Sequence, residues 1–146
     1  MGKPAVGIEI KGIQETLSHY SRLPKNVIDG IVDGVNRATA IVEGGAKRIC
    51  PVDTGLLRNS IHIKPATVLA NEVTGAVYTA VEYAPYVEFG TGVRGEATNT
   101  NEKYPVAYSS DWAGQIAQPF LYPALENNKD KIEKMIYQSI AQSLAR

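Results

Sequence analysis

The stretch PKNVIDGIVDGVNRATAIVEGGAKRIC, residues 24–50, decides the fold because it has the longest run of helical spacing in the chain. Pro24 suits the first residue of a helix. Cys50 precedes Pro51, and the residue before a proline is disfavoured in helical backbone. The sequence therefore predicts one helix of about 26 residues, roughly 39 Å long. Its apolar stripe, with one residue every three or four positions, consists of Ile28, Ile31, Val35, Ala38, Val42, Ala46 and Ile49.

Four glycines interrupt this helix, at positions 30, 34, 44 and 45. Each weakens a helix by about 1 kcal/mol relative to alanine. Gly30 and Gly34 stand four residues apart and so share one face. Two interpretations stay open for this pair: simple tolerance in a well-packed helix, or close approach of a neighbouring backbone, that of another subunit included.

Three segments have the alternating pattern of half-buried strands. Residues 6–11 alternate apolar with polar or small side chains, which predicts a short strand. Residues 60–65 and 72–79 do the same on either side of a turn at Ala70-Asn71. We expect these two segments to form an antiparallel hairpin with one covered face.

Two more segments have helical spacing. Residues 13–20 predict a short helix, and residues 121–144 predict a terminal helix with Pro123 in its first turn. The apolar stripe of the terminal helix consists of Leu121, Leu125, Ile132, Ile136, Ile140 and Leu144.

Between the hairpin and the terminal helix, residues 93–117 have no sustained periodicity. They carry Tyr104, Tyr108 and Trp112, which favour contact surfaces, so we expect an arm or loop that becomes ordered mainly on assembly. The order of elements predicts a single α+β domain over residues 1–146. In it a small antiparallel sheet packs against a long N-terminal helix and a C-terminal helix, with a long loop between.

The composition narrows the classes of function. Lysine plus arginine and aspartate plus glutamate number 15 each, so the formal net charge is zero and no basic run is present to bind phosphates. This disfavours a dedicated nucleic-acid-binding module, and it removes long-range self-repulsion between copies. Cys50 is the single cysteine, which excludes an internal disulfide and predicts a small buried apolar residue. No run approaches the ~20 apolar residues of a membrane helix, and no secretory signal is evident. We therefore expect no membrane association, and synthesis in the host cytoplasm.

Four phrases outside the long helix are rich in turn formers, aromatic residues and single charges. They are PVDTG (51–55), LLRNSI (56–61), YAPYVEFGT (83–91) and QPFLYPAL (118–125). Asp53, Thr54 and Gly55 predict a tight turn that caps a short helical turn. A second helical turn is expected within residues 83–89, with Gly90 and Thr91 in the turn that follows it.

None of these phrases places a nucleophile beside a base, a metal-ligand cluster or a phosphate-binding loop. Asp53 and Glu88 could act as an acid–base pair, but Asp53 suits a turn cap and Glu88 could pair with Arg58 or Arg94. We expect no catalytic residue, no metal ligand and no cofactor. We predict instead that Arg58 and Glu88 contact each other, within one subunit or across an interface, where such a pair fixes orientation.

In the order and spacing of these phrases, the chain resembles the HK97 gp10-like family of tailed-phage and prophage proteins over roughly residues 5 to 145. The resemblance implies a non-enzymatic structural protein of the virion. It implies a six-fold or twelve-fold ring of copies in the neck, which completes the tail and joins it to the head around the DNA channel. Its neighbours would be head-completion or connector proteins on one side and tail-tube or tail-terminator proteins on the other, and DNA would pass without base-specific contact. A tail-terminator or tube-capping subunit stays open as an alternative. A small virion-maturation hydrolase would need a nucleophile and base that are not evident.

A ring closed by head-to-tail contacts needs two different complementary surfaces on each subunit. We expect the turn 83–91 with Arg58 on one side, and the loop 93–117 with residues 118–120 on the other. The expected interface residues are Arg58, Tyr83, Tyr86, Glu88, Phe89, Tyr104, Tyr108, Trp112 and Phe120.

Overall fold

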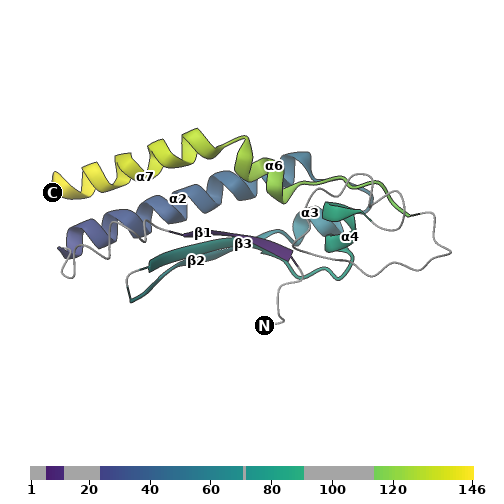
Figure 1. Cartoon of the computed structure of the whole chain (residues 1–146), viewed down its shortest axis with the longest axis horizontal. Coiled ribbons are helices and arrows are strands. Elements are labelled where there is room, and N and C mark those ends of the chain that lie inside the picture. Colours follow the sequence, from purple (N-terminus) through teal and green to yellow (C-terminus); the bar gives the residue numbers. More distant parts are fainter. Residues whose placement is uncertain (1–5, 12–23, 71, 91–113) are drawn as a thin grey trace.

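The structure is a computed structural model, and it describes residues 6–11, 24–70, 72–90 and 114–146. Its elements form three layers (Figure 1). A three-stranded antiparallel sheet is the first layer, the long helix α2 (Lys25–Ile49) is the middle one, and helix α7 (Lys129–Leu144) packs on the far side of α2. The predicted α+β class, a small antiparallel sheet with a long N-terminal helix and C-terminal helical structure, is confirmed.

Helix α2 has nearly the bounds that its sequence predicts. It stops at Cys50, whose backbone is extended (ψ 129°) because Pro51 follows. Pro24 stands one residue before the helix, at the cap position, rather than within the first turn. The buried part of its apolar stripe consists of Ile31, Val35, Ala38, Val42 and Ala46.

The glycines of α2 allow close contact with α7. A Cβ added at Gly30 would lie 2.9 Å from Cα of Ile140, and one added at Gly34 would lie 2.9 Å from Cα of Ile136. Both targets are backbone atoms of α7 in the same chain. Close approach is therefore the correct interpretation of this pair, and the approaching backbone belongs to the same subunit. A Cβ at Gly44 would meet nothing within 4 Å.

The sheet has the order β1-β3-β2, so the last strand along the chain lies in the centre. Its strands are β1 (Val6–Lys11), β2 (His62–Leu69) and β3 (Glu72–Thr79). Val77 on β3 stands opposite Ile8 on β1 and Ile63 on β2, so these three share the face that α2 covers. At Gly75 an added Cβ would lie 2.9 Å from Cγ1 of Val35, which shows how closely α2 approaches the sheet.

Strand β2 runs past Pro65, although the alternation predicted a strand that ends there. The register of β2 against β3 shifts between Lys64 and Thr67. β2 is an edge strand, where a proline without an amide hydrogen is tolerated. The amide of Ala66 donates to Oδ1 of Asn36 on α2 at 2.8 Å, so α2 supplies a hydrogen-bond acceptor for the strand amide next to the proline.

The C-terminal segment forms two helices, and the prediction of one continuous helix was wrong. Helix α6 (Leu121–Glu126) ends at Asn127, and α7 begins after Asn128. The side-chain amide of Asn128 donates to the carbonyl of Ala124 at 2.7 Å. That carbonyl would accept the backbone amide of Asn128 in a continuous helix, so the side chain competes with helical hydrogen bonding at this point.

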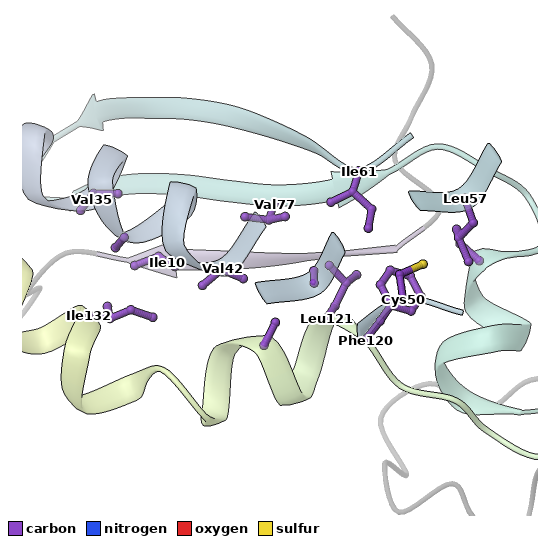
Figure 2. Close-up of a cluster of buried hydrophobic side chains, with 14 of the residues drawn as sticks. Ile10, Val35, Val42, Cys50, Leu57, Ile61, Val77, Phe120, Leu121 and Ile132 are labelled. Atoms are coloured by element: carbon purple, nitrogen blue, oxygen red, sulfur yellow. The ribbon is translucent and has the colours of Figure 1, made fainter. Parts of the chain in front are cut away.

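Other predictions lie outside the described residues: the short helix at 13–20 and most of the loop at 93–117. The hydrophobic core joins α2, the inner face of the sheet and α6 (Figure 2). Its largest fully buried side chains are Phe120, Ile61, Leu121, Val35, Val42, Val73 and Val77. In the described part of the chain, no helix has the length and apolar character needed to span a bilayer.

Candidate functional site

The four phrases gather at one end of the sheet. Helix α3 (Leu56–Asn59) directly precedes β2, and α4 (Ala84–Phe89) follows β3 after a short turn. Figure 1 shows both helices at the end of the sheet away from the β2–β3 hairpin turn. The chain order of the hairpin therefore brings the first three phrases together, and residues 118–122 return to the same place.

The first turn is formed as the sequence predicts. Gly55 caps α3 with a left-handed backbone (φ 83°), a conformation that glycine adopts without steric cost. The amide of Leu56 donates to Oγ1 of Thr54 at 3.4 Å, so Thr54 rather than Asp53 accepts the local bond. Ser60 and Thr79 then share a hydrogen bond of 2.6 Å between hydroxyls, which joins the end of α3 to the end of β3.

The second turn is also formed. Helix α4 ends at Gly90, whose backbone has φ 76° and whose amide donates to the carbonyl of Tyr86 at 2.9 Å. Thr91 lies outside the described residues. The carbonyl of Val87 accepts the amide of Gln118 at 2.8 Å, so the described residues on the two sides of segment 91–113 lie next to each other.

Glu88 is the main polar contact between α4 and α6. Its side chain is buried, with 4% of its surface exposed. Oε2 accepts the amides of Phe120 at 2.8 Å and Leu121 at 3.0 Å, and Oε1 accepts the amide of Tyr122 at 2.9 Å. These amides belong to the start of α6, where helical N–H groups have no partner within the helix. One carboxylate from α4 therefore caps a helix more than thirty residues away.

This contact replaces the predicted ion pair within the chain. Both oxygens of Glu88 accept backbone amides, and its carboxylate makes no ion pair with Arg58. Arg58 is exposed on α3, whereas Glu88 is inside. Phe120, expected at an interface, is fully buried in the core. The described chain therefore uses Glu88 and Phe120 for internal packing.

Cys50 lies in the core beside these elements. Burial raises the pKa of its thiol above the ordinary value, the charge of Arg58 opposes that shift, and the charge of Glu88 adds to it. A buried thiol with a raised pKa is a poor nucleophile because the thiolate is the reactive form. The prediction of a buried apolar residue at this position is confirmed.

A groove of about 300 Å³ opens beside α3 and α4. Leu57 and Val87 are its buried residues, with 5% and 8% of their surface exposed. Val52, Leu56 and Tyr83 line it with 54%, 57% and 42% of their surface exposed. The other lining residues are Pro51, Asp53, Thr54, Gly55, Gln115 and Gln118. An apolar centre with polar residues around it is the pattern of a surface that binds another chain.

The expected interface residues divide into three groups. Arg58, Tyr83 and Tyr86 are exposed, and Phe89 is half-buried. Glu88 and Phe120 are buried, as described above. Tyr104, Tyr108 and Trp112 lie outside the described residues.

Val52 and Leu56 were not among the predicted interface residues. The consecutive leucines 56 and 57 could have indicated Leu56, because a helix of only four residues cannot bury two consecutive side chains against one core. Leu57 is buried, and Leu56 points into the groove region with 57% of its surface exposed. Among the described residues, no cluster of three or more histidine, cysteine, aspartate or glutamate side chains could hold a metal ion.

Comparison with known proteins gives one family. A family model described as "Bacteriophage HK97-gp10, putative tail-component" matches residues 12–90, which is more than half of the chain. The match includes α2, α3, the hairpin and α4. No curated protein and no solved structure matches the chain.

Proposed function

Because this chain belongs to the HK97 gp10-like family of phage tail components, we propose that it forms a ring in the neck of a tailed phage or prophage particle. In that place it completes the tail and joins it to the head around the DNA channel. As a tail component the chain belongs to the virion and contacts other virion proteins. Its role is structural, in keeping with the family.

The observation that supports this proposal best is the groove beside α3 and α4. The phrases that carry the family resemblance build it, and three of its lining residues (Val52, Leu56 and Tyr83) are large apolar side chains exposed by 42% or more. Water-exposed apolar side chains gathered around a groove favour contact with another protein. Nearby, Tyr86 adds an aromatic ring exposed by 44%. Aromatic side chains are enriched where proteins bind each other.

Glu88 gives this end of the molecule a fixed shape. Its three hydrogen bonds hold the start of α6 against α4, and Gln118 is tied to Val87. Of the residues that line the groove, Leu56, Leu57 and Val87 stand on the short helices α3 and α4, and Gln118 is held to α4 by its backbone hydrogen bond. A preorganised surface loses less conformational entropy when it binds.

Balanced charge fits the same role. With zero net charge, copies of the chain do not repel each other at long range. The second ring surface is proposed to come from the loop 93–117 with residues 118–120, of which Phe120 contributes from the core because its side chain is buried. DNA would pass through the channel without base-reading contacts.

Deletion of the gene from an inducible prophage or lytic phage tests the proposal. We expect filled heads and separate tails in negative-stain electron micrographs, with infectivity restored by wild-type protein supplied in trans. Tails of uncontrolled length would indicate a tail-terminator role instead. Infectious particles with firmly attached tails, in the absence of the protein, would contradict both roles.

A further inference from the structure

The turn of the β2–β3 hairpin carries an apolar projection. Val68 is exposed by 49% and Leu69 by 75%, the largest exposed fraction among the large apolar side chains that the structure describes. We call Val68, Leu69 and Ala70 the hairpin tip. Ala70 has a positive φ of 51°, which is uncommon outside glycine and asparagine. The backbone therefore adopts a costly conformation at the point where it displays two apolar side chains to water.

The hairpin tip cannot contact the groove of its own chain. β2 begins beside α3 and runs for eight residues before the turn, so the tip lies about 26 Å from the groove end at ~3.3 Å per residue. Figure 1 shows the hairpin turn and α3 with α4 at opposite ends of the sheet. One chain thus carries an apolar projection at one end and an apolar groove at the other.

The two surfaces suit each other chemically. Val68, Leu69 and Ala70 are uncharged, and Asp53 is the charged residue among the described residues that line the groove. Glu72 stands opposite Leu69 in the hairpin, so the inserted part is the pair Val68 and Leu69, with Glu72 at the rim of the contact. At about 300 Å³ the groove is at the small end of the range for binding clefts, ~300–1,000 Å³. It suits one or two aliphatic side chains better than a whole helix.

We infer that the hairpin tip of one copy inserts into the groove beside α3 and α4 of the next copy. This inference rests on the proposed ring and identifies one of its subunit contacts. A contact between two different surfaces is head-to-tail, and repetition of such a contact closes a ring when the rotation permits. A face-to-face pair of identical surfaces would produce only a dimer.

The size of the contact explains how a ring subunit could stay single before assembly. Three small or medium side chains in one groove bury far less than the ~1,200 Å² typical of a stable complex. One such contact gives a weak pair. In a closed ring each copy makes the contact twice, and neighbouring virion proteins hold the copies together, so the same weak contact becomes stable.

Cysteine cross-linking tests the inference. Leu69→Cys and Leu56→Cys are each introduced into full-length chains with Cys50→Ala, so that the introduced thiol is the only one. The two variants are supplied together in trans to particles that lack the native protein, and assembled particles are then oxidised. We expect a disulfide-linked dimer between the two variants, at least ten times more abundant than the dimer formed by either variant alone. The matched control pairs Leu69→Cys with Tyr137→Cys, because Tyr137 on α7 is exposed by 65%, at least as much as Leu56 at 57%, but lies outside the groove. We expect no linked dimer from that pair.

The outcomes separate this inference from the proposed function. Abundant linkage of Leu69→Cys with itself would indicate contact between identical hairpins and overturn the inference. Attached tails without any linkage between positions 69 and 56 would also overturn it, while leaving the neck role intact. If Cys50→Ala reduces folding, the native background replaces it, because the Cys50 thiol is buried and is not accessible for cross-linking.

Discussion

Replacement of Glu88 by alanine is the sharpest perturbation that the structure offers. The substitution removes the acceptor of three backbone amides, those of Phe120, Leu121 and Tyr122. Each buried donor left without a partner costs about 1–3 kcal/mol. Tyr122 is exposed, so water can reach its amide, and the two buried donors dominate the loss. We expect Glu88→Ala to lower the free energy of unfolding by about 3–5 kcal/mol, a large share of the ~5–15 kcal/mol that holds a typical domain together.

Glu88→Gln should have a smaller effect. Glutamine keeps one carbonyl oxygen, which can take the position of Oε2 and accept the amides of Phe120 and Leu121. Its amide group would then face the amide of Tyr122, so one hydrogen bond and the charge are lost. We expect a loss of about 1–3 kcal/mol for this variant. Glu82→Ala is the matched control, because Glu82 is an exposed acid just before α4. It should change stability by less than about 0.5 kcal/mol.

Urea denaturation followed by circular dichroism measures these differences. With a slope of about 2 kcal/mol per molar urea, Glu88→Ala should lower the midpoint by about 2 M, with the slope unchanged. Arg58→Ala is a further control, since Arg58 is exposed and makes no ion pair with Glu88. A Glu88→Ala variant as stable as Glu82→Ala would refute the capping role. Equal losses of unfolding free energy in Glu88→Ala and Arg58→Ala would instead support the predicted ion pair between Arg58 and Glu88.

Three further predictions concern helix α2 and the core. Gly34→Ala should destabilise the protein by about 1–2 kcal/mol, because its Cβ would meet the α7 backbone at 2.9 Å. Gly44→Ala should stabilise it by about 0.5–1 kcal/mol, because an added Cβ there meets nothing within 4 Å, and urea unfolding compares the two variants. Phe120→Ala should cost about 3–5 kcal/mol, and Tyr122→Ala, with 59% of the side chain exposed, much less by the same assay. Burial raises the pKa of the Cys50 thiol in the folded chain, so the thiol of the unfolded chain ionises first as pH rises above about 8.5, and the free energy of unfolding falls there. When the free energy of unfolding is measured against pH, it should fall less steeply in Cys50→Ala than in the native chain.

Local patterns in the sequence predicted the parts of the fold that depend on neighbouring residues. The stripe of α2, its end before Pro51 and the left-handed turns at Gly55 and Gly90 all follow from residues within a few positions of each other. The hairpin follows from alternation on both sides of residues 70–71. Such features depend on backbone sterics and period, which are visible in one short window.

Features that depend on distant residues could not be predicted in the same way. Glu88 has its partners more than thirty residues along the chain, and nothing near it in sequence identifies them. The split between α6 and α7 was missed because the apolar spacing continues across Asn128, although an asparagine side chain is known to compete for helical carbonyls. Leu56 was missed for a third reason: only the packing of Leu57 shows which of the two leucines remains exposed.

The most direct test of the proposed neck ring is electron cryomicroscopy of intact particles at the junction of head and tail. The account predicts a closed ring around the DNA channel in which every subunit shows α2 between the sheet and α7. Density for this fold elsewhere in the particle, or a junction built without it, would contradict the proposed function.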